Sequence, residues 1–131
     1  MTTVWRYVYS YTQQEPALQK PHSEQAQKLE QELRRGVLTL AVLSQLKSPQ
    51  YGYSLRQNLD ARGMPIEEGT LYPLLRRMEE QGLLKSEWKI EDGPPRRYYA
   101  RNAAGERVYK ELVAIWNALA GTLETLMEGG R

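Results

Sequence analysis

The chain has 131 residues and a formal net charge of +2 at pH 7, and it contains no cysteine and a single histidine, His22. Disulfide bonds, thiolate metal sites and thiol catalysis are therefore excluded, and most histidine-based metal or general-base sites are as well. The longest apolar run, at positions 37–43, is far too short to cross a membrane, and no signal peptide or glycine-rich phosphate loop is visible. We expect a cytoplasmic protein that is not an enzyme and has no metal, no cofactor and no membrane partner.

Positive charge is concentrated in the middle of the chain. Positions 34–107 hold 13 Lys and Arg against 9 Asp and Glu, a local net charge of +4, whereas the two flanks hold 5 against 7, a net of −2. The overall excess is too small to indicate nucleic-acid binding by itself. Its distribution directs attention to the middle segment.

The first 22 residues form a segment of their own. Aromatic residues alternate over positions 4–11 as in a strand, and Pro16 and Pro21 end the pattern. We expect residues 1–22 to be an aromatic arm that packs on the body of the protein or on a partner subunit. Contact of the arm with a ligand or with DNA is the alternative.

Two helices are predicted between Ser23 and Gly63. Ser23 has a hydroxyl suited to capping, and leucine and valine then recur every three or four residues until the pattern ends at residue 46. The second helix covers about residues 51–62, and Gly63 is its expected C-terminal cap.

A third helix is predicted from Thr70, taken as its cap, to Gly82. Pro73 then lies in the first turn, where a missing N–H costs little. Thr70 can serve both as a cap and as a phosphate ligand, and Tyr72 can contact a base or seal the helix packing. The buried side carries Leu71, Leu74, Leu75 and Met78, and the exposed side carries Tyr72, Arg76 and Arg77.

A β-hairpin and a long helix complete the pattern. Positions 84–90 alternate polar and apolar, 91–95 form a turn, and 96–101 return as a second strand; Trp88 is expected to face the helices and join the core. Asn102 can cap a final helix to about residue 127. Its apolar stripe is too extensive to leave in water and predicts a homodimer interface formed by Val108, Leu112, Ile115, Trp116, Leu119, Leu123 and Leu126.

Three short helices followed by a basic hairpin predict a mainly α protein with a winged helix-turn-helix. We expect the arm (1–22), a winged-helix domain (23–102) and a dimerisation helix (103–131). In this layout the third helix enters the major groove of double-stranded DNA and the hairpin, or wing, contacts the backbone. The predicted DNA-binding residues are Thr70, Tyr72, Arg76, Arg77, Lys89, Arg96 and Arg97.

Several segments resemble the PadR-like transcriptional regulators. These are Tyr51-Gly52-Tyr53-Ser54-Leu55, the run from Gly69-Thr70-Leu71-Tyr72-Pro73 to Leu84, and Arg97-Tyr98-Tyr99 followed by Gly105. The resemblance covers about residues 35–127 and implies a dimeric, sequence-specific, nucleoid-associated repressor that acts by promoter occlusion. Arg101-Asn102 departs from the Leu-Thr usual in the family, which leaves the packing around Arg101 open.

Further features of the sequence bear on which gene the protein regulates and on alternative functions. The arm, the first helix and the chain length are similar to those of clock-modifying cyanobacterial repressors within the family, which implies a circadian clock gene as target. Trp116 lies where related regulators place an aromatic that stacks on flat ligands, so a ligand-responsive repressor of a detoxification or efflux gene is an alternative. The effector is unknown. A winged-helix module used only for protein–protein contacts is the remaining alternative.

Overall fold

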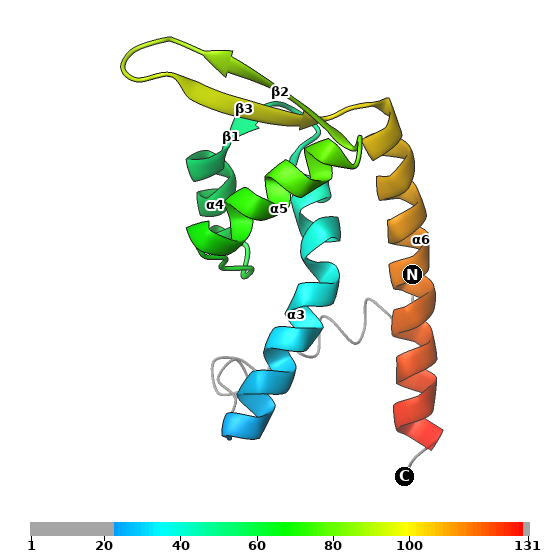
Figure 1. Ribbon diagram of the computed structural model, residues 1–131. Coiled ribbons are helices and arrows are strands. Elements are labelled where there is room, and N and C mark those ends of the chain that lie inside the picture. Colours follow the sequence, from blue (N-terminus) through cyan, green and yellow to red (C-terminus); the bar gives the residue numbers. More distant parts are fainter. Residues whose placement is uncertain (1–22, 130–131) are drawn as a thin grey trace. The chain divides into compact units, whose positions relative to one another are not determined.

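A computed structural model describes residues 23–129, and the chain divides into two compact units. Residues 36–111 form one unit; the described part of the other comprises residues 23–35 and 112–129. The predicted arm over residues 1–22 lies outside the described residues. The elements are α3 (Glu24–Gln45), β1 (Gln50–Tyr51), α4 (Gly52–Ala61), α5 (Glu68–Glu80), β2 (Leu84–Lys89), β3 (Arg96–Arg101) and α6 (Ala103–Gly129) (Figure 1).

The order of these elements confirms a mainly helical fold with a small antiparallel sheet. Within residues 36–111, Figure 1 shows the sheet lying along α4 and α5, with the turn of the β2–β3 hairpin projecting past them. None of the helices in the described part of the chain is long and apolar enough to span a membrane.

Local capping chemistry sets several helix ends. The Ser23 Oγ accepts a hydrogen bond from the Ala26 N–H at 3.0 Å, and Asn102 Oδ1 accepts one from the Gly105 N–H at 2.8 Å, so both predicted caps are confirmed. Gly63, with φ +91°, follows α4 in the left-handed conformation that lets the chain leave the helix. The N–H of the next residue, Met64, then returns to the Leu59 carbonyl at 2.8 Å.

The predicted start of the third helix is wrong by three residues, because its cap is Glu67 and not Thr70. The helix α5 begins at Glu68, and the Glu67 carbonyl accepts the N–H groups of Thr70 and Leu71 at 3.0 and 2.9 Å. Glu68 suits the first turn because a carboxylate is stabilised by the positive end of the helix dipole, and it also pairs with Arg56 at 3.0 Å. Thr70 is therefore not the cap but the third residue of the helix.

Because α5 begins earlier, the prediction for Pro73 is also wrong. Pro73 is the sixth residue of α5 and lies beyond the first turn, where its missing N–H removes an intrahelical hydrogen bond. The helix nevertheless continues to Glu80, since four apolar side chains bury one face. These are Leu71, Leu74, Leu75 and Met78, the residues expected from the sequence.

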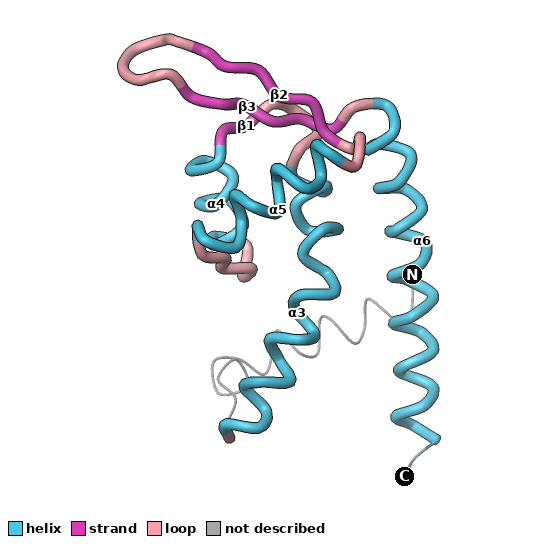
Figure 2. Tube along the Cα trace, viewed as in Figure 1, coloured by secondary structure: helices cyan, strands magenta, loops and turns pink. Residues whose placement is uncertain are grey.

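The sheet contains a third strand that periodicity does not predict. Its strand order is β1-β3-β2, and the two-residue β1 pairs Gln50 with Tyr99 and Tyr51 with Tyr98 (Figure 2). The helical pattern alone places Tyr51 at the start of the second helix. A strand of two residues has no period to detect and forms only because β3 supplies hydrogen-bonding partners.

The prediction that Trp88 belongs to the core is wrong. Its residue surface is 64% exposed, although Leu84 on the same face of β2 is buried. Ser86, between them, contacts Glu79 in the last turn of α5. Trp88 lies two residues closer to the hairpin tip than Ser86, beyond this contact with α5. Strand alternation therefore predicts the face on which Trp88 lies but not whether it is buried.

Arg101, the departure from the family pattern, is a buried and fully engaged side chain. Only 6% of it is exposed, and its guanidinium bonds Glu106 in the first turn of α6 at 2.7 Å. Its Nη1 donates to the Leu43 carbonyl, near the C-terminus of α3, at 2.7 Å, and the guanidinium carbon lies 4.4 Å from the Tyr109 ring centroid. Arg101 therefore ties three elements of the 36–111 unit together.

We expect Arg101→Ala to lower the free energy of unfolding by about 2 kcal/mol, because it removes a charge-assisted hydrogen bond to the Leu43 carbonyl and the close ion pair with Glu106. Thermal or denaturant unfolding measures this loss. Arg107→Ala is the control, because Arg107 is exposed and lies next to Glu106 in the first turns of α6; it should change the free energy of unfolding by less than about 0.5 kcal/mol. Equal stabilities for the two variants would contradict the role assigned to Arg101.

Candidate nucleic-acid interface

The helix α5 presents two arginines to solvent. Arg76 and Arg77 are exposed, whereas Leu75 and Met78 beside them in sequence are buried in the core. Neither guanidinium forms a salt bridge with any residue in the described range 23–129. A guanidinium without an ion-pair partner keeps its fork of N–H donors available for guanine or phosphate.

Thr70 and Tyr72 occupy the first half of α5 in different environments. Thr70 is exposed, as a phosphate or base contact requires. Tyr72 is half-buried, and its ring lies where a Cβ on Gly52 would be, so only glycine fits at the start of α4. Tyr72 therefore packs α5 against α4, one of the two roles expected of it, and its contact with DNA stays a prediction.

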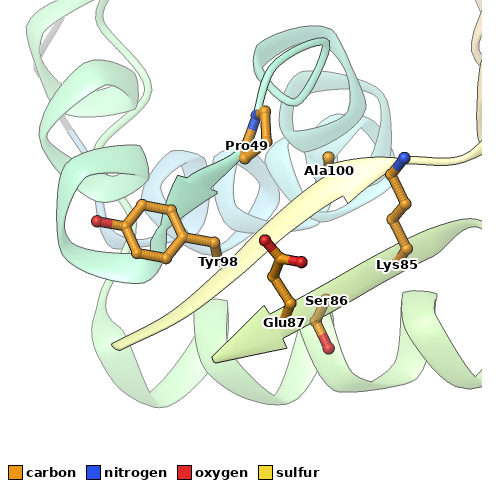
Figure 3. A pocket seen from close by; sticks show the side chains of 6 residues that line it. All are labelled: Pro49, Lys85, Ser86, Glu87, Tyr98 and Ala100. Atoms are coloured by element: carbon orange, nitrogen blue, oxygen red, sulfur yellow. The ribbon is translucent and has the colours of Figure 1, made fainter. Parts of the chain in front are cut away.

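The hairpin has two faces of different chemistry. In the antiparallel register Trp88 pairs with Arg97 and Ser86 with Tyr99 on one face. The neighbouring residues Lys85, Glu87, Lys89, Arg96 and Tyr98 lie on the other face, and Figure 3 shows Lys85 and Glu87 on the opposite side of β2 from Ser86. Adjacent arginines in the sequence, Arg96 and Arg97, thus point to opposite faces.

Lys89 and Arg96 are held over tyrosine rings on their face. The Lys89 Nζ lies 4.8 Å from the Tyr98 ring centroid and the Arg96 guanidinium carbon lies 4.7 Å from that of Tyr51. The Tyr51 and Tyr98 rings are themselves 5.4 Å apart. Such contacts orient the two cations while leaving Arg96 exposed to solvent. Sequence reasoning missed this cluster because Tyr51 joins it through β1.

Arg97 differs from the other predicted wing cations because its carboxylate partner is close and belongs to another element, whereas Lys89 lies 3.8 Å from Glu87 of its own strand. The Arg97 Nη2 lies 2.8 Å from the Glu79 Oε1 of α5, and its Nε donates to the Ser86 Oγ at 3.0 Å. Beside this pair, burial raises the pKa of the Tyr99 phenol; Glu79 raises it further, while Arg97 and Arg76 oppose the shift. Tyr99 is therefore neutral at physiological pH.

A depression of about 190 Å³ lies on the outer face of the sheet (Figure 3). This volume is below that of ordinary small-molecule sites. The depression is lined by Pro49, Lys85, Ser86, Glu87, Tyr98 and Ala100.

In the described part of the chain, no cluster of three His, Asp or Glu side chains is arranged to hold a metal ion.

The predicted dimerisation stripe lies on α6 and is largely uncovered. Val108 and Leu112 are half-buried, whereas Trp116 is 38% and Leu119 53% exposed. The role of this stripe as a dimer interface stays a prediction. The other exposed large apolar residues of the helix are Ile115, Leu123, Leu126 and Met127.

Known proteins with the same arrangement are transcriptional regulators. A PadR family transcriptional regulator from Eggerthella lenta is 48% identical, covers 79% of this chain and 92% of its own, and superimposes with a TM-score of 0.75. A PadR-like regulator from Bacillus cereus is 30% identical, with a TM-score of 0.66 and coverage of 73% of this chain and 96% of its own.

Sequence comparison gives the same result. The transcriptional regulator Rv3488 of Mycobacterium tuberculosis is 37% identical over 81 residues, which are 61% of this chain and 76% of that protein. The sequence model of the transcriptional regulator PadR-like family matches residues 39–111, the segment that contains α4, α5 and the hairpin. The chain therefore belongs to the PadR-like family of transcriptional regulators.

Proposed function

We propose that this protein is a sequence-specific DNA-binding repressor that acts as a homodimer by occluding a promoter. The observation that carries the proposal is the pair Arg76 and Arg77, exposed and without salt bridges in the described residues, on a helix whose opposite face is buried. The recognition helix, α5, would read base edges in the major groove. Lys89 and Arg96 would contact phosphates from the wing.

The homodimer is supported by the apolar face of α6. Six large apolar side chains between Ile115 and Met127 are more than a third exposed, which is unfavourable for an isolated protomer. A second copy offers an identical stripe, and a two-fold axis lets each stripe cover the other. Such a dimer carries two recognition helices, and its operator should contain two half-sites about 34 Å apart.

Sequencing of genomic DNA recovered with the protein tests the proposal and identifies the operator. We expect enrichment of a short, inverted-repeat sequence that the purified protein then binds in preference to a scrambled duplex. Binding only of other proteins, with no DNA at low salt, would support the protein–protein module instead. Release from the operator by a planar aromatic compound, lost on Trp116→Ala, would favour the ligand-responsive repressor.

The same experiment tests the proposed target. The aromatic arm and the first helix are similar to those of the period extender Pex, a cyanobacterial clock modifier, which supports a circadian clock gene as the regulated gene. A clock-gene promoter among the enriched fragments is the expected result. Enrichment of other promoters alone would reject this target and leave the repressor proposal intact.

We expect Arg96→Ala to weaken binding to all DNA sequences to a similar extent, because the proposed contacts of the wing are with phosphates and not with base edges. The slope of log affinity against log salt should shrink by about 0.9 for each phosphate that the variant no longer neutralises. Titrations of operator and scrambled DNA at several salt concentrations measure both effects. An unchanged slope together with a relaxed sequence preference would show that Arg96 reads bases.

A further inference from the structure

Arg97 belongs to a closed ring of hydrogen bonds that joins three elements. Its Nη2 donates to Glu79 Oε1 at 2.8 Å and its Nε donates to Ser86 Oγ at 3.0 Å. The Ser86 hydroxyl in turn donates to Glu79 Oε2 at 2.7 Å. The ring therefore uses both carboxylate oxygens of Glu79 on α5 and connects them to β2 and β3.

The surroundings of this ring hold the guanidinium in place. The side chains of Arg97 and Glu79 are only 36% and 29% exposed, so solvent screens their attraction less than it screens an exposed pair. The guanidinium carbon also lies 5.4 Å from the ring centroid of Tyr99 and 5.9 Å from that of Trp88. Because Glu79 neutralises it at close range, Arg97 adds little net positive charge to the surface.

The carboxylate partner lies on the helix proposed to read DNA. Glu79 is three residues beyond Arg76 on α5, so a tie at Glu79 acts on the same turn of helix that carries the exposed arginine. The ring thus fixes the last turn of α5 against the middle of the hairpin. Contacts made by two elements to one DNA site are strongest when the spacing of the elements is set before binding.

We propose that Arg97 is a positioning residue that holds the wing at a fixed place on the recognition helix through Glu79 and Ser86, and is not a phosphate ligand. The proposal rests on the DNA-binding function proposed above. It also revises the expectation, drawn from the sequence, that Arg97 serves the same purpose as Arg96.

Removal of the Glu79 carboxylate distinguishes a phosphate-binding from a positioning role of Arg97, because the two roles predict opposite changes in affinity for DNA. If Arg97 bound phosphate, Glu79→Ala would free the cation and strengthen DNA binding. If Arg97 is a positioning residue, Glu79→Ala should weaken operator binding about tenfold, although the protein becomes more positive. Glu80→Ala removes an equal charge from the next, exposed position and should not weaken binding.

Variants of Arg97 give a second comparison. Arg97→Ala should weaken operator binding about as much as Glu79→Ala, and the double variant no more than either single one, because all three break the same ring. The salt slope should stay at the parent value. Arg97→Lys keeps the charge but loses the fork that reaches Glu79 and Ser86 together, so it should resemble Arg97→Ala. A reduced slope in Arg97→Ala, rescued by Arg97→Lys, would overturn the proposal.

Amide hydrogen exchange in the free protein tests the positioning role without DNA. We expect faster exchange in β2 and β3 for Arg97→Ala and Glu79→Ala, and parent-like exchange for Arg96→Ala and Glu80→Ala. Unchanged exchange in Arg97→Ala would overturn the positioning role whatever the DNA measurements show. If the parent protein binds no DNA, the proposed function is refuted. Faster exchange in Arg97→Ala and Glu79→Ala would then still establish that Arg97 connects α5 to the wing.

Discussion

Replacing both Arg76 and Arg77 by alanine is expected to weaken operator binding about 5- to 150-fold, because an arginine–guanine pair contributes about 1–3 kcal/mol of discrimination. The fold should be unaffected. Both side chains are exposed, and the buried face of α5 is formed by other residues, so the free energy of unfolding should change by no more than about 0.5 kcal/mol. Thermal unfolding and titrations with operator and scrambled duplexes measure the two quantities.

The single variants and the scrambled duplex assign the role of each arginine. Sequence-specific contact predicts that affinity for the operator falls while much of the affinity for scrambled DNA is retained. Equal losses on both duplexes would make Arg76 and Arg77 phosphate contacts and leave sequence reading to Thr70, Tyr72 or DNA shape. A folded double variant with parent-like operator affinity would reject α5 as the recognition helix.

Introducing charge into the apolar stripe of α6 is expected to have a comparably large effect. Leu119→Glu places a carboxylate at a position that is 53% exposed in the protomer but covered in the proposed dimer. Burial of two unpaired carboxylates at a two-fold interface costs several kcal/mol, so the variant should be monomeric at micromolar concentration. Sedimentation should then give about the chain mass of 15.2 kDa, against twice that mass for the parent.

Loss of the dimer should also remove high-affinity operator binding, because one protomer contacts only one half-site. Asn117→Glu, on the same helix but outside the apolar stripe, is the matched control and should remain dimeric. Circular dichroism of both variants separates dissociation from unfolding. A parent protein that sediments as a monomer would refute the proposed interface.

Much of the fold could be predicted because its signals are local. The buried face of α5 follows from leucines and a methionine at helical spacing, and the caps at Ser23 and Asn102 act within three residues of themselves. The start of α5 could not be predicted in the same way, because Glu67 initiates the helix through its backbone carbonyl alone. No side-chain hydrogen bond marks this start.

The candidate site was predictable only in part, for the same reason. The exposure of Arg76 and Arg77 follows from helical periodicity and agrees with the structure. That Arg97 has a partner does not follow, because Glu79 is 18 residues away and reaches it only when the hairpin folds onto α5. Strand alternation does imply that Arg96 and Arg97 lie on opposite faces, so the two cations have different surroundings.

The sequence by itself determined the helices and the hairpin and which side of each is apolar, because periodicity, capping and turn chemistry depend on residues within a few positions of one another. Only the tertiary structure decided what covers each side. It left Trp88 exposed beyond the reach of α5, buried Arg101 between Leu43 and Glu106, and paired β1 with β3. These outcomes depend on which distant segments meet, and no local pattern in the chain specifies that.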